Sequence, residues 1–455
     1  MRRRHVLATL VAAGAAVVLV AGPQMSSAVA DSNQLFIYRV SATSEAAAQR
    51  LFHDGFDVLE NRSGTDLFVL GDDATAAKLR GAGFRPAVAE KLTPTSWKAP
   101  STRLVPDAAA PVVAPIDETY YGGYHTVRAQ YAHLDKVATD HASVATVVDY
   151  GDSYLKTRNP ATGYDLKAIC LTRKQSGDCG LTPSAPKPRF LLMTQIHARE
   201  IVTGDLAWRF IDHLANGYGS NTQVTALLDS TEVWVVPIVN PDGVDVVQQG
   251  GNRPYLQRKN LNGAAGCANP PTASNQVGVD LNRNTSSHWG SAGVSTNRCA
   301  QTYLGASADS EPETRAIEGL FRKLYADQRG PNDGDAAPAT TRGAMISIHS
   351  YAGMNLFPWG WSTRDSANDA PLRAIAAQMS QYNGYRYGQP GEILYNAAGT
   401  SDDWSYGELG IASFTIELAS CGGFTPAYSC TSTDWSRNLP ALMYVAGKAK
   451  APYQP

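Results

Sequence analysis

Between residues 117 and 450, apolar runs of strand length alternate with amphipathic runs of helix length. Segments 190–195 and 233–239 are apolar, as strands buried on both faces are, whereas 204–215 has the periodicity of an amphipathic helix. The other predicted elements are strands at 344–348 and 413–418 and helices at 311–328, 371–382 and 439–449. This alternation is typical of helices packed around a mainly parallel sheet. We therefore predict one large α/β domain over 117–450, with functional side chains at the carboxyl ends of its strands.

The first thirty residues have the three parts of a secretory signal peptide. Three arginines at 2–4 precede an apolar run at 6–22, and a small-residue cleavage site ends at Ala30. A membrane anchor is the alternative, but the run is short for a span of about 20 residues. The formal net charge of −2 gives no basic field for nucleic acid. We expect a secreted, extracellular protein that, once its signal is removed, binds neither membranes nor nucleic acid.

The six cysteines are an even number, which in an exported chain indicates disulfides. Many pairings are possible, and the simplest joins each cysteine to its nearest neighbour in sequence. These pairs are Cys170–Cys179, Cys267–Cys299 and Cys421–Cys430. A zinc finger is not expected, because no Cys-x-x-Cys pair occurs.

A small domain is predicted over residues 31–92. Its strands are expected at 33–40, 56–60 and 65–71 with a last one from about Phe84, and its helices at 44–54 and 72–80. The order β-α-β-β-α-β is that of the ferredoxin-like unit. Since this segment contains no cysteine and no catalytic cluster, we predict a small α+β domain without chemistry of its own.

Residues 93–116 lose this periodicity. Prolines from Pro94 to Pro115 break any helix, and Lys98 and Arg103 lie among small residues. Exposed irregular segments are preferred sites of proteolysis. An inert small domain, a cleavable joint and a large domain together indicate a pro-domain released by an activating protease. A plain interdomain linker is the alternative interpretation.

His197 and Glu200 form a His-x-x-Glu pair directly after the predicted strand at 190–195. On a helical turn the two side chains share one face, and both are zinc ligands. The pair alone is a weak signal. His349 follows the strand at 344–348, and two histidines with one glutamate form a catalytic zinc site that keeps one open position. We expect one Zn²⁺ per chain, bound by these three residues.

Several short motifs occur in one order across the large domain. They are His197-x-x-Glu200, Asn240-Pro241-Asp242-Gly243, Asp280-x-Asn282-Arg283, Ser310-Glu311-Pro312-Glu313, Ile348-His349-Ser350-Tyr351 and Phe414-Thr415-Ile416-Glu417-Leu418. Together they resemble the zinc metallocarboxypeptidases of the carboxypeptidase A/B type over about residues 117–450. The resemblance implies a mixed, largely parallel eight-stranded sheet sandwiched by helices and preceded by a pro-domain. It also implies an enzyme that hydrolyses the C-terminal peptide bond of peptides and proteins. Since nothing in the sequence suggests an oligomer, we expect a monomer.

Glu417 alternates with apolar residues in its predicted strand, and a buried carboxylate is costly unless it is paired or functional. A zinc hydrolase needs a base for the attacking water and an acid for the leaving amine, and one glutamate can serve as both. The resemblance assigns that role to Glu417, with a structural salt bridge as the alternative. It assigns the stabilisation of the oxyanion to Arg258, for which Arg253 and Lys259 are rivals.

Asn282 and Arg283 resemble the pair that holds the terminal carboxylate of the substrate, which a guanidinium binds through two parallel hydrogen bonds. An internal peptide bond has no such carboxylate, so this clamp predicts an exopeptidase. The resemblance implies that Asp280 supports a ligand histidine through its second ring nitrogen and that Tyr395 closes over the substrate. Further substrate contacts are expected from Arg199, Ser350 and Tyr351.

Asp402 matches the base of the family's side-chain pocket, which is apolar in A-like members and carries Asp in B-like members. An Asp there attracts Lys or Arg side chains. We therefore expect basic C-terminal residues to be accepted, with apolar residues as a second class. The alternative is that Asp402, beside Asp403, caps the next turn. The sequence departs from the family at Thr285, where the family often has an aromatic residue, and in the loop 250–276. The resemblance therefore does not predict the residues that form the wall of the pocket.

Two other functions fit part of the pattern. A related zinc peptidase that acts on cell-wall peptide stems would share the three metal ligands and Glu417 but differ in the pocket. A non-catalytic binding protein would lack a ligand or the base. The joint presence of Asn282, Arg283, Tyr395 and Asp402 favours the carboxypeptidase.

Overall fold

The computed structural model describes residues 34–92, 116–263 and 266–454. The predicted signal peptide at 1–30 and the linker at 93–116, apart from its last residue, lie outside the described residues.

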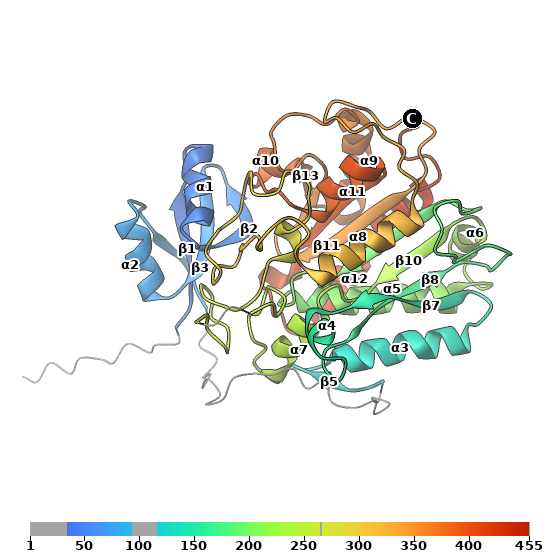
Figure 1. Cartoon of the computed structure of the whole chain (residues 1–455), viewed down its shortest axis with the longest axis horizontal. Coiled ribbons are helices and arrows are strands. Elements are labelled where there is room, and N and C mark those ends of the chain that lie inside the picture. The colour runs from blue at the N-terminus through green and yellow to red at the C-terminus, as the bar shows by residue number, and fades with distance from the viewer. Residues whose placement is uncertain (1–33, 93–115, 264–265, 455) are drawn as a thin grey trace, which may run out of the picture. The chain divides into compact units, whose positions relative to one another are not determined.

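The N-terminal domain has the predicted order of strands and helices (Figure 1). Its elements are β1 (Phe36–Ser41), α1 (Glu45–His53), β2 (Asp57–Ser63), β3 (Asp66–Gly71), α2 (Asp73–Gly81) and β4 (Ala87–Lys91). The strands form an antiparallel sheet in the order β2-β3-β1-β4. Ser44 caps α1, and Asp72 with Thr75 forms a capping box on α2. Leu51 and Leu79 bring both helices onto one face of this sheet.

The large domain is built on an eight-stranded mixed sheet, as the resemblance implies. Its strands are β7 (Ala145–Asp152), β8 (Asp165–Leu171), β9 (Arg189–Thr194), β10 (Glu232–Val236), β11 (Ala344–Ser350), β12 (Met354–Leu356), β13 (Arg386–Gly388) and β14 (Ala412–Leu418). The order across the sheet is β13-β12-β14-β11-β9-β10-β8-β7. The four central strands β14, β11, β9 and β10 run parallel, and antiparallel pairings flank them. A two-stranded hairpin, β5 (Thr119–Tyr120) and β6 (Tyr124–His125), precedes the sheet.

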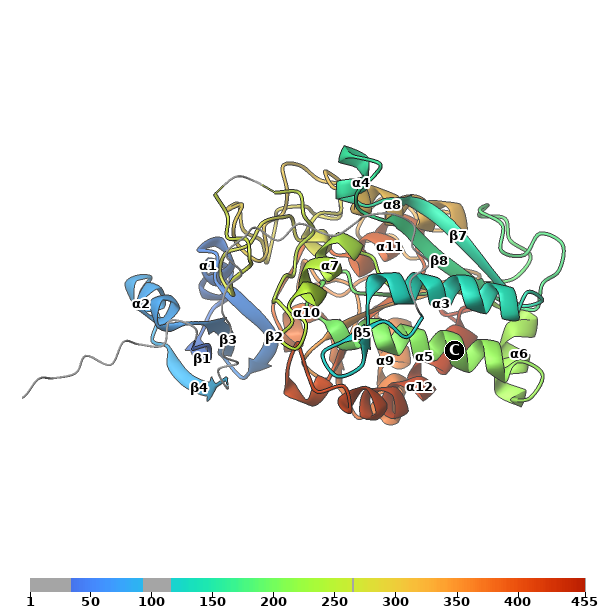
Figure 2. The same ribbon diagram turned by 90° about the horizontal axis from the view of Figure 1, so that it is seen from below.

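Helices cover both faces of this sheet (Figures 1 and 2). They are α3 (Val127–Asp140), α4 (Tyr154–Arg158), α5 (Ile201–Gly217), α6 (Thr222–Ser230), α7 (Pro241–Gln249), α8 (Pro312–Leu324), α9 (Asp369–Asn383), α10 (Pro390–Ile393), α11 (Ser401–Leu409) and α12 (Cys430–Lys448), with short 3₁₀ turns at Leu281–Arg283 and Ser420–Gly422. Side chains of β9 alternate between the faces: Phe190 and Leu192 pack with the core of α5 and α12, whereas Leu191 and Met193 pack with that of α8.

Two predicted helix boundaries are wrong. The last helix begins at Cys430 rather than at 439, and Pro440, which the prediction put at its first turn, lies inside it. Packing against α9 and α5 extends this helix beyond what its local sequence indicates. Helix α8 ends at Leu324 rather than at 328, where Tyr325 turns to extended backbone.

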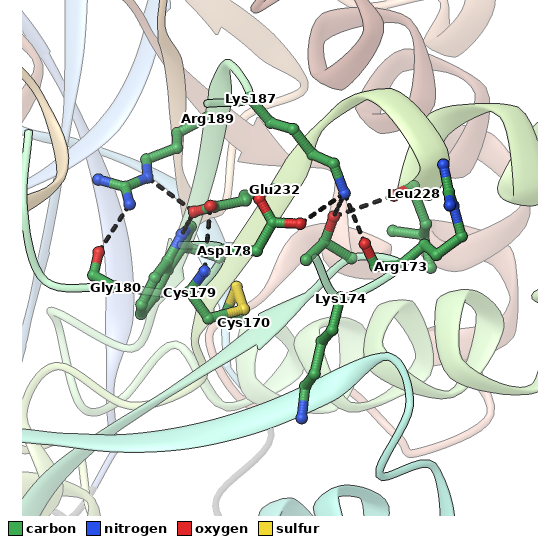
Figure 3. Close-up of a disulfide and its surroundings, with 12 residues drawn as sticks. Cys170, Arg173, Lys174, Asp178, Cys179, Gly180, Lys187, Arg189, Leu228 and Glu232 are labelled. Carbon is green, nitrogen blue, oxygen red and sulfur yellow. Dashed lines mark hydrogen bonds and ion pairs between the residues drawn. A yellow bond between two sulfur atoms is a disulfide. The ribbon is translucent and has the colours of Figure 1, made fainter. Parts of the chain in front are cut away.

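The three disulfides join nearest neighbours in sequence, as the simplest prediction has it. Figure 3 shows Cys170–Cys179 beside two buried ion pairs. Lys187 contacts Asp178 at 2.8 Å, and Arg189 contacts Glu232 at 2.7 Å. Arg189 and Glu232 are the first residues of β9 and β10, so this network fixes the ends of the strands that lie opposite the candidate site.

None of the helices in the described part of the chain combines the length and the apolar character that a membrane span requires.

The pH dependence of stability is predicted to include a contribution from Glu318 on α8. Burial and the neighbouring Asp309 raise the pKa of Glu318 to about 9, against about 4.3 in an unfolded chain. Folding therefore keeps a proton that the unfolded chain releases, so this contribution is complete below pH 4 and is lost as the pH rises towards 9. Glu318→Gln, which mimics the protonated acid, should raise the melting temperature more at pH 8.5 than at pH 5. An equal shift at both values would contradict the assignment.

Candidate metal centre and substrate pocket

The pairing of three parallel strands brings the predicted site residues together. β11 lies between β9 and β14, and its register sets His349 directly beside Glu417. β9 pairs with β11 up to Thr194, and a turn then carries the chain to His197. Since carboxyl ends of parallel strands meet at one edge, residues far apart in sequence become neighbours there.

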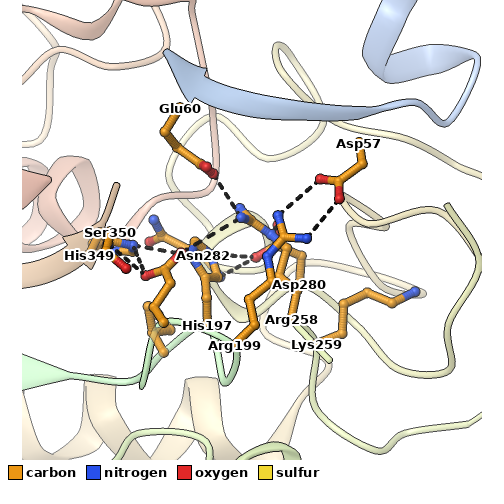
Figure 4. A network of polar contacts seen from close by, with 12 residues as sticks. Asp57, Glu60, His197, Arg199, Arg258, Lys259, Asp280, Asn282, His349 and Ser350 are labelled. Carbon is orange, nitrogen blue, oxygen red and sulfur yellow. Dashed lines mark hydrogen bonds and ion pairs between the residues drawn. The ribbon is translucent and has the colours of Figure 1, made fainter. Parts of the chain in front are cut away.

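His197, Glu200 and His349 form a buried cluster whose ligand atoms all lie within 4.8 Å of one another. Figure 4 shows the two histidines of this cluster. The Nδ1 atom of His197 is 2.7 Å from Glu200 Oε1, and that of His349 is 3.2 Å from Glu200 Oε2. The two Nδ1 atoms face each other at 3.1 Å. Glu200 begins α5 without capping it, so its carboxylate is directed to the cluster instead. Two imidazoles and one carboxylate are a catalytic zinc donor set, and these three residues are the zinc-binding triad.

The second nitrogen of each ligand histidine has its own partner. His197 Nε2 lies 3.2 Å from Asp280 Oδ1, and His349 Nε2 lies 2.9 Å from Ser347 Oγ. A histidine that donates through Nε2–H keeps the lone pair of Nδ1 free for a metal. Asp280 also accepts a hydrogen bond from Arg258 Nε at 3.0 Å. Although burial opposes it, the positive charge of Arg258 holds the pKa of Asp280 well below its usual range, so Asp280 stays charged.

Glu417 lines the same cavity as the two histidines. Its side chain is buried, and its Oε2 atom has no hydrogen-bond partner among the described residues. Burial raises the pKa of Glu417 well above its usual range, and the carboxylates of Glu60 and Glu200 raise it further. A buried carboxyl group with an unpaired oxygen and a raised proton affinity has the properties of a group that accepts and returns protons.

Arg258 is the one of the three rival basic residues that lines the described cavity, whereas Arg253 and Lys259 do not. Its guanidinium lies between Asp280 and Glu60, with Nη1 2.8 Å from Glu60 Oε1. Lys259 Nζ is directed away and donates to the carbonyl oxygens of Arg298 and Ala300.

Asn282 and Arg283 also line the cavity, in the 3₁₀ turn that Asp280 caps. Arg283 donates from Nε to the carbonyl oxygen of Gly293 at 2.9 Å and from Nη1 to that of Asn282 at 2.8 Å. Asn282 Oδ1 accepts the backbone N–H of Ser401 at 2.9 Å. These bonds hold both side chains in the wall of the cavity.

The other predicted substrate contacts lie around the same centre, and two of them contact the N-terminal domain. Tyr395 is buried against Phe52, with ring centres 4.6 Å apart, and Arg199 pairs with Asp57 through two hydrogen bonds of 2.7 and 2.9 Å. The remaining two are Ser350, whose N–H lies 3.3 Å from Glu200 Oε2, and Tyr351, which packs against Phe424.

Asp402 and Asp403 have different surroundings in the first turn of α11. Asp402 lines the cavity and accepts a hydrogen bond from Thr415 Oγ1 at 3.1 Å, so it does not cap the helix. Asp403 is turned away and accepts the backbone N–H groups of Gly360 and Trp361 at 2.7 and 3.0 Å. The carboxylate of Asp402 is therefore the one that faces the pocket.

The sequence-based prediction does not include the two acidic residues of β2 that contact arginines of the site, Asp57 and Glu60. A register irregularity between Val58 and Arg62 interrupts the alternation of this edge strand, and both carboxylates reach arginines of the large domain. No motif identifies them, because their partners lie more than a hundred residues away. The one signal in the sequence is that the predicted strand at 56–60 has two acids among otherwise apolar residues.

Two of the sequence motifs act as supports. Asn260, two residues after Arg258 in the same loop, donates to Glu311 and Glu313 at 2.8 and 3.0 Å. Asp242 accepts hydrogen bonds from Ser153 Oγ and the backbone N–H of Leu155, both at 2.8 Å. Glu311 and Glu313 thus connect the loop of Arg258 to the start of α8, and Asp242 connects α7 to the start of α4.

Comparison with known proteins gives a consistent result. A family model described as zinc carboxypeptidase matches residues 130–441. Carboxypeptidase B2 of Homo sapiens is 30% identical over 315 residues, which are 67% of this chain and 65% of that protein. A zinc carboxypeptidase of Saccharothrix mutabilis subsp. capreolus is 28% identical over 460 residues, which are 97% of this chain and 95% of the relative.

The fold has a solved counterpart. The crystal structure of thrombin-activatable fibrinolysis inhibitor superposes with a TM-score of 0.66 at 22% identity, over 92% of this chain and 99% of that one. The match to human carboxypeptidase B2 spans somewhat less than two thirds of that protein's own length. With a family model covering more than half of its residues and a complete zinc-binding triad, the chain belongs to the zinc carboxypeptidase family.

Proposed function

We propose that this protein is a secreted carboxypeptidase that removes single residues from the C-termini of peptides and proteins. The observation that carries the proposal is the shared cavity, which is lined by two zinc ligands, Glu417 and the Asn282–Arg283 pair. A zinc ion at the triad supplies Lewis-acid polarisation of the scissile carbonyl and eases deprotonation of water. The chain's own residues supply orientation, proton transfer and charge stabilisation.

The proposed mechanism uses four residues. Arg283 and Asn282 hold the terminal carboxylate, which sets the last peptide bond beside Glu417. Glu417 takes a proton from the attacking water as its oxygen bonds to the carbonyl carbon. Arg258 donates a hydrogen bond to the oxyanion that develops. Glu417 then returns the proton to the leaving nitrogen as the C–N bond breaks, which releases one amino acid and a shortened peptide.

We infer a preference for basic C-terminal residues, with apolar residues as a second class. The carboxylate of Asp402 lines the pocket together with the apolar side chains of Leu356, Leu394 and Ala397. The carboxylate attracts an ammonium or guanidinium group, and the apolar walls bury the methylene chain of Lys or Arg or a whole aliphatic side chain.

We also infer that the protein is a monomer made as a latent precursor. Glu60 lines the cavity and pairs with Arg258, while Asp57 occupies both outer nitrogens of Arg199. In this state the guanidinium proposed to bind the oxyanion is already engaged. Cleavage between the two domains by an activating protease, in the predicted linker, would free both arginines. The disulfides and the predicted signal peptide support an extracellular location.

Zinc content tests the metal centre directly. Purified protein should contain about one zinc per chain by elemental analysis, and His349→Ala should lose it because only two ligands remain. His213→Ala is the matched control, since this half-buried histidine on α5 packs against Trp435 rather than at the cluster. Equal zinc content in both variants would refute the assigned ligands.

Peptide trimming tests the reaction and the pocket. After cleavage of the linker and inhibition of the activating protease, the enzyme should remove Arg or Lys from test peptides in a chelator-sensitive reaction. A C-terminal amide should block it, because Arg283 then loses its partner. Asp402→Asn should lower kcat/KM for Arg by about tenfold or more, as expected for a charge-assisted hydrogen bond of about 1.5–3 kcal/mol. Leu release should change little.

The opposite result in this assay has a clear meaning. Zinc-loaded, cleaved enzyme that trims no linear peptide would refute the carboxypeptidase proposal, and cell-wall peptide stems would then be the next substrates.

Latency is tested with the uncleaved chain. The double variant Asp57→Asn with Glu60→Gln should raise the activity of intact precursor by about tenfold or more, because it removes two buried charge-assisted contacts. Asp66→Asn is the control, since Asp66 pairs with Arg39 within the N-terminal domain. Gel analysis must verify that the chain is intact. Unchanged activity of the double variant would exclude these carboxylates as the inhibitory contacts.

A further inference from the structure

Thr400 is an N-cap threonine whose hydroxyl caps nothing. It occupies the N-cap position of α11, where a threonine oxygen ordinarily accepts a backbone N–H from the first turn. No such side-chain bond is present, and Trp404 N–H is bonded to the backbone carbonyl of Thr400 instead. The adjacent N–H of Ser401 is taken by Asn282 Oδ1. The helix start is therefore secured without this hydroxyl.

The unused hydroxyl is buried, and Thr400 lines the candidate pocket. Thr400 is only 6% exposed, and its Oγ1 atom has no hydrogen-bond partner among the described residues. Thr400 lines the same cavity as Asp402 and Thr415. A buried hydroxyl without a partner costs free energy, so a polar group of a bound molecule is the expected partner.

In the same pocket, only one of the two carboxylate oxygens of Asp402 accepts a hydrogen bond from the described residues. Its Oδ2 atom accepts the hydroxyl of Thr415, and the described residues offer no hydrogen bond to Oδ1. A lysine ammonium carries three donors and an arginine guanidinium five, so a single carboxylate oxygen leaves most of them unpaired. The Thr400 hydroxyl, two residues before Asp402 on the same turn, offers a further acceptor to a group at the pocket base.

We propose that Thr400 is a specificity-determining residue that accepts a hydrogen bond from the side-chain nitrogen of a C-terminal Lys or Arg, together with Asp402. Thr415 acts as a positioning residue that holds Asp402 in place. This inference rests on the proposed basic specificity and adds a second acceptor to it. An aliphatic substrate leaves the Thr400 hydroxyl unpaired, so the residue also selects against apolar C-termini.

The experiment compares Thr400→Val with Thr400→Ser on peptides that end in Lys, Arg or Leu. Valine matches the shape of threonine without its hydroxyl, and serine keeps the hydroxyl. Thr400→Val should lower kcat/KM for Lys and Arg by about tenfold to a hundredfold, the range for a hydrogen bond to a charged group. Leu release should stay constant or rise. Thr400→Ser should stay within about twofold of the wild type for all three peptides.

Two further measurements separate the possible causes. The melting temperature of Thr400→Val should equal or exceed that of the wild type, since the hydroxyl caps no helix and its burial without a partner costs free energy. Binding of free lysine and free leucine to the zinc-loaded enzyme, measured by calorimetry, should change for lysine only. An equal loss for all three peptides in Thr400→Val, or no loss for Lys and Arg, would overturn the proposal.

Failure of the proposed basic specificity would look different. In that case the wild type would show no preference for Lys or Arg, or Asp402→Asn would leave the preference unchanged. If both of those controls behave as proposed and Thr400→Val is silent, the role of Thr400 alone is refuted.

Discussion

The chemistry of this protein depends on the parallel pairing of β9, β11 and β14. Each pair of strands is held by a ladder of backbone hydrogen bonds, and the register sets His349 beside Glu417. Because side chains alternate in a strand, a slip of one residue in β11 would turn His349 to the opposite face. Apolar side chains on both faces of these strands, such as Ile346 and Met345, make such a slip costly. The packing of the hydrophobic core therefore fixes the position of His349 relative to Glu417.

Buried charge is balanced around this centre by a small number of shared partners. Asp280 contacts a ligand histidine with one oxygen and Arg258 with the other, so one carboxylate orients both. Isolated charges in such surroundings would be strongly destabilising, and each group here has an opposite charge within reach. Among the described residues that line the cavity, Glu60, Glu417 and Thr400 each have a buried side-chain oxygen without a hydrogen-bond partner.

The N-terminal domain also contributes opposite charges to this centre, through ion pairs with two arginines. The large domain offers arginines that are suited to the charges of a substrate or transition state, and Asp57 and Glu60 satisfy them in its place. A domain without catalytic residues of its own can thus occupy a site by supplying two carboxylates. The apolar contacts of Phe52 with Tyr395 and of Ile37 with Phe424 hold these carboxylates in position.

The sequence by itself determined the fold class and the zinc-binding triad, and the simplest of the disulfide pairings that it allows is the one in the structure. These features follow from local patterns: an apolar run ending in His-x-x-Glu, a strand ending in His349, and cysteines close to one another in sequence. Helix ends were less predictable, because α12 is extended by packing rather than by its own residues. Only the tertiary structure decided that Asp57 and Glu60 contact Arg199 and Arg258, and that the Thr400 hydroxyl lacks a partner. Such contacts join segments remote in sequence, and no local pattern encodes the distance between them.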